Sequence, residues 1–65
     1  MKVKFFTEIF VANEEHPLGH GVGITEDASI AEAILHLKSH NYTTRQIASI
    51  ETYQIPQHYS ATELA

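Results

Sequence analysis

The sequence predicts a small α+β domain of ββαβ order, in which one helix packs on one face of a three-stranded sheet. Apolar residues alternate with other residues in three segments, as they do in half-buried strands. Between the second and third of these segments, over about residues 27–40, they recur every three to four residues, as they do in a helix. A chain of 65 residues makes one domain, so we expect a single domain over 1–65, with 56–65 as a polar C-terminal tail.

The first predicted strand lies in KVKFFTEIFVA, residues 2–12. Its β-branched and aromatic content and its period of two are typical of a strand. The alternate set that best suits a core is Val3, Phe5, Thr7, Ile9 and Val11. Phe6 and Phe10 therefore stand on the opposite face, beside the charged Lys4 and Glu8.

The next segments predict a loop and a second strand. Asn13 and Pro17 interrupt the alternation, which indicates a turn. In HGVGIT, residues 20–25, one face carries His20, Val22 and Ile24, and the other carries the glycines at 19, 21 and 23. Alternating glycines usually mark a strand that another backbone approaches closely or that a bulge bends. An antiparallel hairpin with the first strand is the simplest arrangement.

The helix is predicted from Asp27 to about His40. Its apolar stripe consists of Ile30, Ile34 and Leu37, with Ala33 beside them and Asn41 at the end. Ser29 followed by Glu32 matches a capping box, and Asp27 is a competing N-cap. The segment HNYTT ends the helix.

The segment RQIASIETYQI, residues 45–55, allows two interpretations. As a strand it places Ala48, Ile50, Thr52 and Gln54 on one face and Ile47, Ser49, Glu51, Tyr53 and Ile55 on the other. As a helix it would place Ile47 and Ile50 on one side. The β-rich end favours a strand that stops at Pro56. The preceding helix permits a parallel crossover, so this strand need not neighbour the second one.

Charge and composition predict a protein partner. The net charge of −4 provides no basic stripe for nucleic acid, and no apolar run approaches the roughly 20 residues of a membrane helix. There are no cysteines for disulfides or thiolate zinc, and a domain this small has little stability to spare. We therefore expect a cytoplasmic protein that forms a homo-oligomer or binds another protein, and that contacts neither nucleic acid nor membrane.

The five histidines raise a metal site as the alternative function. On a helix, Glu32, His36 and His40 would share one flank, and His16, His20 or His58 could supply a fourth ligand. These residues equally suit a polar helix flank and a loop. The chain has no H-E-x-x-H pattern, so we assign no metal ligand from sequence.

Other chemistry finds less support. GHGVG lacks the spacing of a dinucleotide or phosphate loop, and Glu26 and Asp27 put negative charge where an anion would sit, so no cofactor is expected. No serine has a nucleophile-elbow setting and no carboxylate pair is singled out, so no catalytic residue is assigned and the protein is expected not to be an enzyme.

The last third of the chain resembles the second and third helices of bacterial helix-turn-helix regulators. The resemblance rests on Thr43, Arg45, Ile47, Ala48, Ile55 and Pro56, which match a T-x-R-x-I-A opening and a later I-P. The stretch between Ala48 and Ile55 is longer than the usual turn, and QHYSATELA contains no Lys or Arg. A DNA-binding regulator is thus a further alternative, and it predicts a helix over 47–52.

The function favoured by the sequence is a non-enzymatic protein-binding module, such as an inhibitor, adaptor or accessory subunit. Its expected interface is the set of large apolar residues on the sheet face that a single helix leaves open: Phe6, Phe10, Tyr53 and Ile55. We expect self-association through this face or through an edge strand. Acidic, cysteine-free chains of this length are similar in general character to small proteins of phages and mobile elements.

Overall fold

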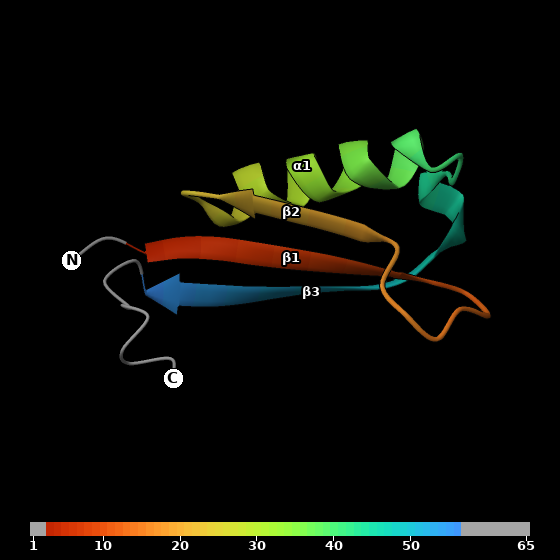
Figure 1. Ribbon diagram of the computed structural model, residues 1–65, viewed down its shortest axis with the longest axis horizontal. Coiled ribbons are helices and arrows are strands. Elements are labelled where there is room, and N and C mark those ends of the chain that lie inside the picture. The colour runs from red at the N-terminus through yellow and green to blue at the C-terminus, as the bar shows by residue number, and fades with distance from the viewer. Residues whose placement is uncertain (1–2, 57–65) are drawn as a thin grey trace.

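The computed structural model describes residues 3–56 and has the predicted ββαβ order (Figure 1). Its elements are strand β1 (Val3–Val11), strand β2 (Gly19–Gly23), helix α1 (Glu26–Ser39), the single 3-10 turn η1 (Thr44–Gln46) and strand β3 (Ile47–Pro56). The α+β class and the element order are therefore confirmed. The predicted tail lies outside the described residues, apart from Pro56.

The three strands form an antiparallel sheet in the order β2-β1-β3. The predicted hairpin of β1 and β2 is confirmed, and β3 pairs with the other side of β1. β2 and β3 therefore run parallel to each other without being neighbours, and α1 provides the crossover between them. α1 packs mainly on β2 and β1 (Figure 1).

The glycine face of β2 allows α1 to lie directly against the strand. A Cβ at Gly21 would collide with the backbone of Ser29 and Ala33, and a Cβ at Gly19 would lie 2.8 Å from the Ala33 carbonyl oxygen. Of the two explanations offered for the alternating glycines, a close approach or a bulge, the structure shows the close approach. Helix and strand touch through backbone and small side chains rather than through large apolar ones.

This close contact explains why the predicted helix stripe is rotated. The buried helix positions are Ser29, Ala33 and Leu37, whereas Ile30 and Ile34 are only half-buried. Small residues face the glycines because larger side chains would hold the two backbones apart. The predicted stripe is therefore right for Leu37, Ala33 and the half-buried Ile34, which packs against the core, but Ser29 rather than Ile30 is the buried residue of the first turns.

The helix also begins differently from the prediction. Thr25 is the N-cap, and its hydroxyl accepts a hydrogen bond from the Ala28 amide at 3.0 Å. Ser29 lies inside the helix, where its hydroxyl donates to the Glu26 carbonyl, so the predicted cap at Ser29 or Asp27 is wrong. Glu26 and Asp27 instead occupy the first turn, where negative charge complements the helix dipole.

β3 contains a bulge that changes the predicted face of one residue. Phe10 pairs with Ser49 and Val11 pairs with Ile47, so Ala48 is an extra residue in the ladder. Ile47 thereby joins the core on the helix side of the sheet, rather than the face that carries Tyr53. Residues 47–56 are strand, and the helix that the DNA-binding alternative requires is not formed.

Within residues 3–56 the hydrophobic core is small. Its buried apolar residues are Ile9, Val11, Ala33 and Leu37, with Leu18, Ile34, Tyr42 and Ile47 packed around them. The set of β1 residues predicted for the core face does point toward α1.

A row of hydrogen-bonded hydroxyl groups connects β3, β1 and α1 beside this core. Thr7 and Ser29 are both fully buried, and their hydroxyl oxygens are 2.7 Å apart. Because the Ser29 proton goes to the Glu26 carbonyl, Thr7 must donate to Ser29. Thr52 must then donate to Thr7, at 2.9 Å. The row runs from β3 through β1 into α1.

Thr7→Val is expected to destabilise the domain by about 1 to 3 kcal/mol, because Ser29 loses its donor and Thr52 its acceptor while the side-chain shape is kept. Urea unfolding followed by circular dichroism measures this cost. In a double-mutant cycle with Ser29→Ala, the two effects should sum to more than the cost of the double variant, since both remove the same bond. Strict additivity would show that the hydrogen bond between Thr7 and Ser29 contributes nothing to stability.

Candidate functional site

The face of the sheet opposite α1 carries a cluster of large side chains from all three strands. Phe6 lies at its centre, paired with Val22 of β2 on one side and Tyr53 of β3 on the other. The rings of Phe6 and Tyr53 are stacked, with centroids 6.4 Å apart. Within the described part of the chain no layer covers this surface, which we call the open face.

The four predicted interface residues all lie on the open face, but in two groups. Phe6, Tyr53 and Ile55 gather toward one end, because Phe6 pairs with Tyr53 and Lys4 pairs with Ile55. Phe10 lies toward the other end, opposite Ser49. Tyr53 and Ile55 are 45% and 39% exposed, a substantial apolar area for a sheet surface.

Val22 belongs to the same surface and is 42% exposed. The sequence analysis did not include it in the interface, although the alternation of glycines in GHGVG already places Val22 on the face away from them. Its pairing with Phe6 required the register of the hairpin, which alternation alone does not provide.

An acidic pair separates Phe10 from the rest of the cluster. Glu8 and Glu51 are directly opposite each other on β1 and β3, an unfavourable position for like charges. The Tyr53 hydroxyl donates a hydrogen bond to Glu51 Oε1 at 2.6 Å. This hydrogen bond is the main reason that the pKa of Tyr53 is raised to about 12, with smaller contributions from desolvation and from the charges of Glu51 and Glu8.

The raised pKa predicts a loss of stability in alkali. The folded state holds the phenol proton more tightly than the unfolded chain, so this contribution is complete below about pH 10 and is lost as pH rises from 10 toward 12. Absorbance at 295 nm measures the ionisation. We expect one tyrosine to ionise near pH 12; this ionisation should be absent in Tyr53→Phe and should move to lower pH in Glu51→Gln. An ionisation near pH 12 that persists in Tyr53→Phe would contradict the assignment to Tyr53.

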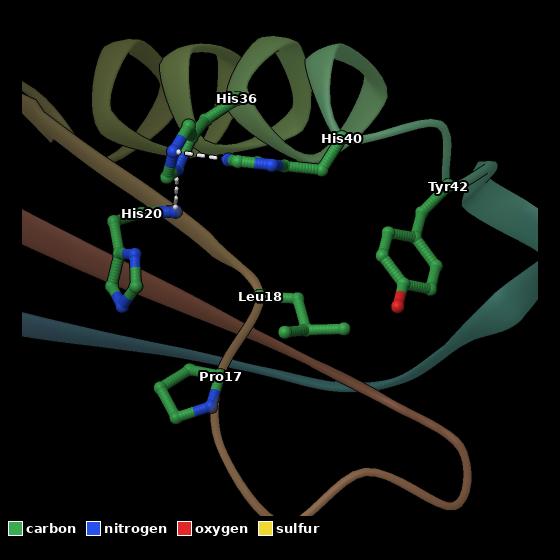
Figure 2. Close-up of a pocket in the computed structure, with 6 residues that line it drawn as sticks. All are labelled: Pro17, Leu18, His20, His36, His40 and Tyr42. Carbon is green, nitrogen blue, oxygen red and sulfur yellow. Dashed lines mark hydrogen bonds between the residues drawn. The ribbon is translucent and has the colours of Figure 1, made fainter.

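A second feature is a shallow hollow of about 410 Å³ at the edge of β2 (Figure 2). It is lined by Pro17, Leu18, His20, His36, His40 and Tyr42. The His20 backbone amide donates to His36 Nδ1 at 3.0 Å, and the two Nε2 atoms of His36 and His40 are 3.1 Å apart. Helix α1 thereby reaches over the strand edge and occupies one of its free amide groups.

These contacts specify the proton positions on two rings. Because His36 Nδ1 accepts from an amide, a neutral His36 carries its proton on Nε2. That proton is donated to His40 Nε2, so a neutral His40 carries its own proton on Nδ1. His36 Nε2 has no free lone pair in this arrangement. A metal ion bound there would move the ring proton to Nδ1, which could then no longer accept the hydrogen bond from the His20 amide of β2.

The predicted metal candidates are brought together only in part. His20, His36 and His40 line the hollow, whereas His16 lies in the exposed loop before β2 and Glu32 is an exposed residue of α1. His58 lies outside the described residues. Over residues 3–56, no three His, Cys, Asp or Glu side chains converge on a point that could hold a metal ion.

The histidine hollow and the open face are connected by aromatic contacts. The ring centroids of His36 and His20 are 5.5 Å apart, and those of His20 and Phe6 are 6.0 Å apart. With His40 and Tyr53 at its two ends, a row of five rings passes from α1 across the whole sheet. The sequence contains these residues at scattered positions, so only the fold could reveal the row.

Comparison with protein-family models, with curated proteins and with solved structures gives no match to this chain. Within residues 3–56, no helix combines the length and the apolar character needed to cross a membrane.

Proposed function

We propose that this chain is a non-catalytic protein-binding module that self-associates through the open face of its sheet. The observation that carries the proposal is the contiguous cluster of Phe6, Val22 and Tyr53 on a surface that α1 leaves uncovered. Aromatic side chains are enriched in protein interfaces, and exposed apolar clusters commonly mark such sites.

The small core argues that the occupant of this face is a second copy. Over residues 3–56, four buried apolar residues make a modest core, and domains of this size commonly need stabilisation beyond a single core. A second sheet stacked on the open face would bury Phe6 and Tyr53 in a second apolar layer. Any two molecules of the protein could form this layer, because each carries the same open face.

The charges of β1 are also arranged for self-pairing. Lys4 and Glu8 lie on the open face at equal distances on either side of Phe6, because side chains two residues apart share a face. A two-fold axis that lies between the two stacked sheets, perpendicular to β1 and close to Phe6, would bring Lys4 of one copy over Glu8 of the other. The positively charged Lys4 side chain would thereby lie beside the acidic pair of Glu8 and Glu51.

The biochemical role we propose for the assembled protein is binding of another protein, as an inhibitor, adaptor or accessory subunit in the cytoplasm. The lack of cysteine suits a reducing compartment. The net charge of −4 suits a partner with a basic surface.

Native mass spectrometry of the untagged protein, before and after EDTA, tests this proposal directly. We expect a metal-free mass of two or more chains that grows with protein concentration. A single-chain mass over the whole micromolar range would contradict self-association. A mass increment lost with EDTA would favour the metal alternative and return attention to His20, His36 and His40.

A further inference from the structure

The two edge strands of the sheet, β2 and β3, differ in how far neighbouring residues cover their outer backbone groups. At the β2 edge, His36 of α1 accepts the hydrogen bond of the His20 amide, so the helix closes part of that edge. At the β3 edge, the described residues provide no strand beyond β3. β3 is also the longest strand, with ten residues. An edge of this length is a template for pairing with another strand.

The backbone groups that face outward from β3 follow from the ladder. The His20 amide points away from β1, so the pair Glu8 and His20 exchanges no hydrogen bonds, and the backbone groups of Glu8 point toward β3. Glu51, opposite Glu8, therefore bonds to β1. By alternation, the amides and carbonyls of Ile50, Thr52 and Gln54 point outward.

The middle of this edge has few of the features that prevent pairing. Charged side chains, prolines and bulges protect natural edge strands. Here the bulge at Ala48 and the proline at position 56 lie at the two ends, and Glu51 is the one charged residue between them. Residues 49–55 are thus a regular segment whose outer edge pairs with no other strand of residues 3–56.

We propose that β3 of a second copy pairs antiparallel with this edge, across a two-fold axis at Thr52, to form a continuous six-stranded sheet. In this register Thr52 pairs with Thr52 of the second copy, and Ile50 pairs with Gln54 of the second copy. Glu51 lies opposite Tyr53 of the second copy, whose hydroxyl is a donor that already binds a Glu51 carboxylate within one chain.

A charge and a proline select this register over the next one in each direction that still pairs outward-facing residues. In the first of these, Glu51 lies directly opposite Glu51 of the second copy, where like charges destabilise a sheet. In the second, Ile50 pairs with Pro56 of the second copy, which has no amide to donate. The register centred on Thr52 avoids both penalties and uses all three outward-facing residues.

This inference rests on the proposed self-association and adds a second contact to it. Face-to-face and edge-to-edge contacts use different surfaces, so one molecule can make both. Two isologous contacts whose two-fold axes intersect at a right angle generate a closed tetramer. In it, the open faces of edge-paired copies form one continuous surface.

Gln54→Pro tests the edge contact. The Gln54 amide points outward, so proline at this position removes a donor from the outer edge and leaves the β1 ladder intact. We expect the mass of the assembly in native mass spectrometry to fall by half, whereas the control Gln54→Ala retains the wild-type mass. An unchanged mass in folded Gln54→Pro would overturn the inference.

Hydrogen exchange of the wild-type protein provides a test without substitution. In the assembly, the amides of Thr52 and Gln54 should exchange as slowly as those of Glu51 and Tyr53, and their protection should fall on dilution. Fast exchange at Thr52 and Gln54 in the assembled protein would overturn edge pairing, whether or not the proline variant folds.

The variant Phe6→Ala/Phe10→Ala separates this inference from the proposed function. It removes the face contact and keeps the edge. Halving of the mass by Gln54→Pro alone supports the edge contact and contradicts the open face. Halving by the phenylalanine variant alone supports the open face and overturns the edge contact.

Discussion

Gly21→Ala is expected to destabilise the domain by about 3 kcal/mol or more, enough to leave a large fraction of a marginal domain unfolded. The added methyl group would meet the backbone of Ser29 and Ala33, and neither can rotate away as a flexible side chain would. The helix would have to move off β2 as a body. That movement would also weaken the contact between Thr7 and Ser29 and the burial of Leu37.

Urea unfolding followed by circular dichroism measures this effect, with Ile24→Ala as the control. Ile24 directly follows β2 and its side chain is 76% exposed, so its truncation should change stability by less than about 1 kcal/mol. Equal stability of Gly21→Ala and the wild type would show that α1 does not lie directly on β2.

Much of this contact was visible in the sequence. Alternation over β1 separates Phe5, Thr7 and Ile9 from Phe6, and the structure keeps this division. The glycines of GHGVG predicted a close backbone approach to β2. Both predictions depend only on side chains pointing to alternate faces of a strand, which holds wherever the strand is regular.

The errors arise where two elements adjust to each other. Apolar spacing assigned Ile30 and Ile34 to the helix stripe, but three glycines in another segment make Ser29 and Ala33 the residues that fit most closely. The bulge at Ala48 is an irregularity of pairing with β1, which alternation within β3 does not specify.

The candidate site depends even more on register. The four residues predicted for an interface do share one face of the sheet, but their division by Glu8 and Glu51 follows from which residue pairs with which. The contacts of His20, His36 and His40 likewise need the helix to lie over the β2 edge. Spacing alone suggested ligands, whereas the geometry provides a hydrogen-bonded chain.

Phe6→Ala is expected to weaken self-association more than Phe10→Ala. Phe6 is central, between Val22 and Tyr53, and truncation of a central aromatic anchor typically costs about 2 kcal/mol, or about 30-fold in the dissociation constant. Phe10 lies beyond the acidic pair, so its truncation should cost less than about 1 kcal/mol. Equal effects would contradict an interface centred on Phe6.

The double variant Phe6→Ala/Phe10→Ala should therefore lose the face contact, with a dissociation constant raised about 100-fold. Its fold should persist because neither side chain belongs to the core beneath α1. Sedimentation velocity over a concentration series measures the association, and circular dichroism checks the fold. Leu35→Ala is the matched control, since Leu35 is a 68% exposed apolar residue of α1 outside the open face. If Leu35→Ala dissociates the assembly and the double variant does not, the contact surface is the helix rather than the sheet.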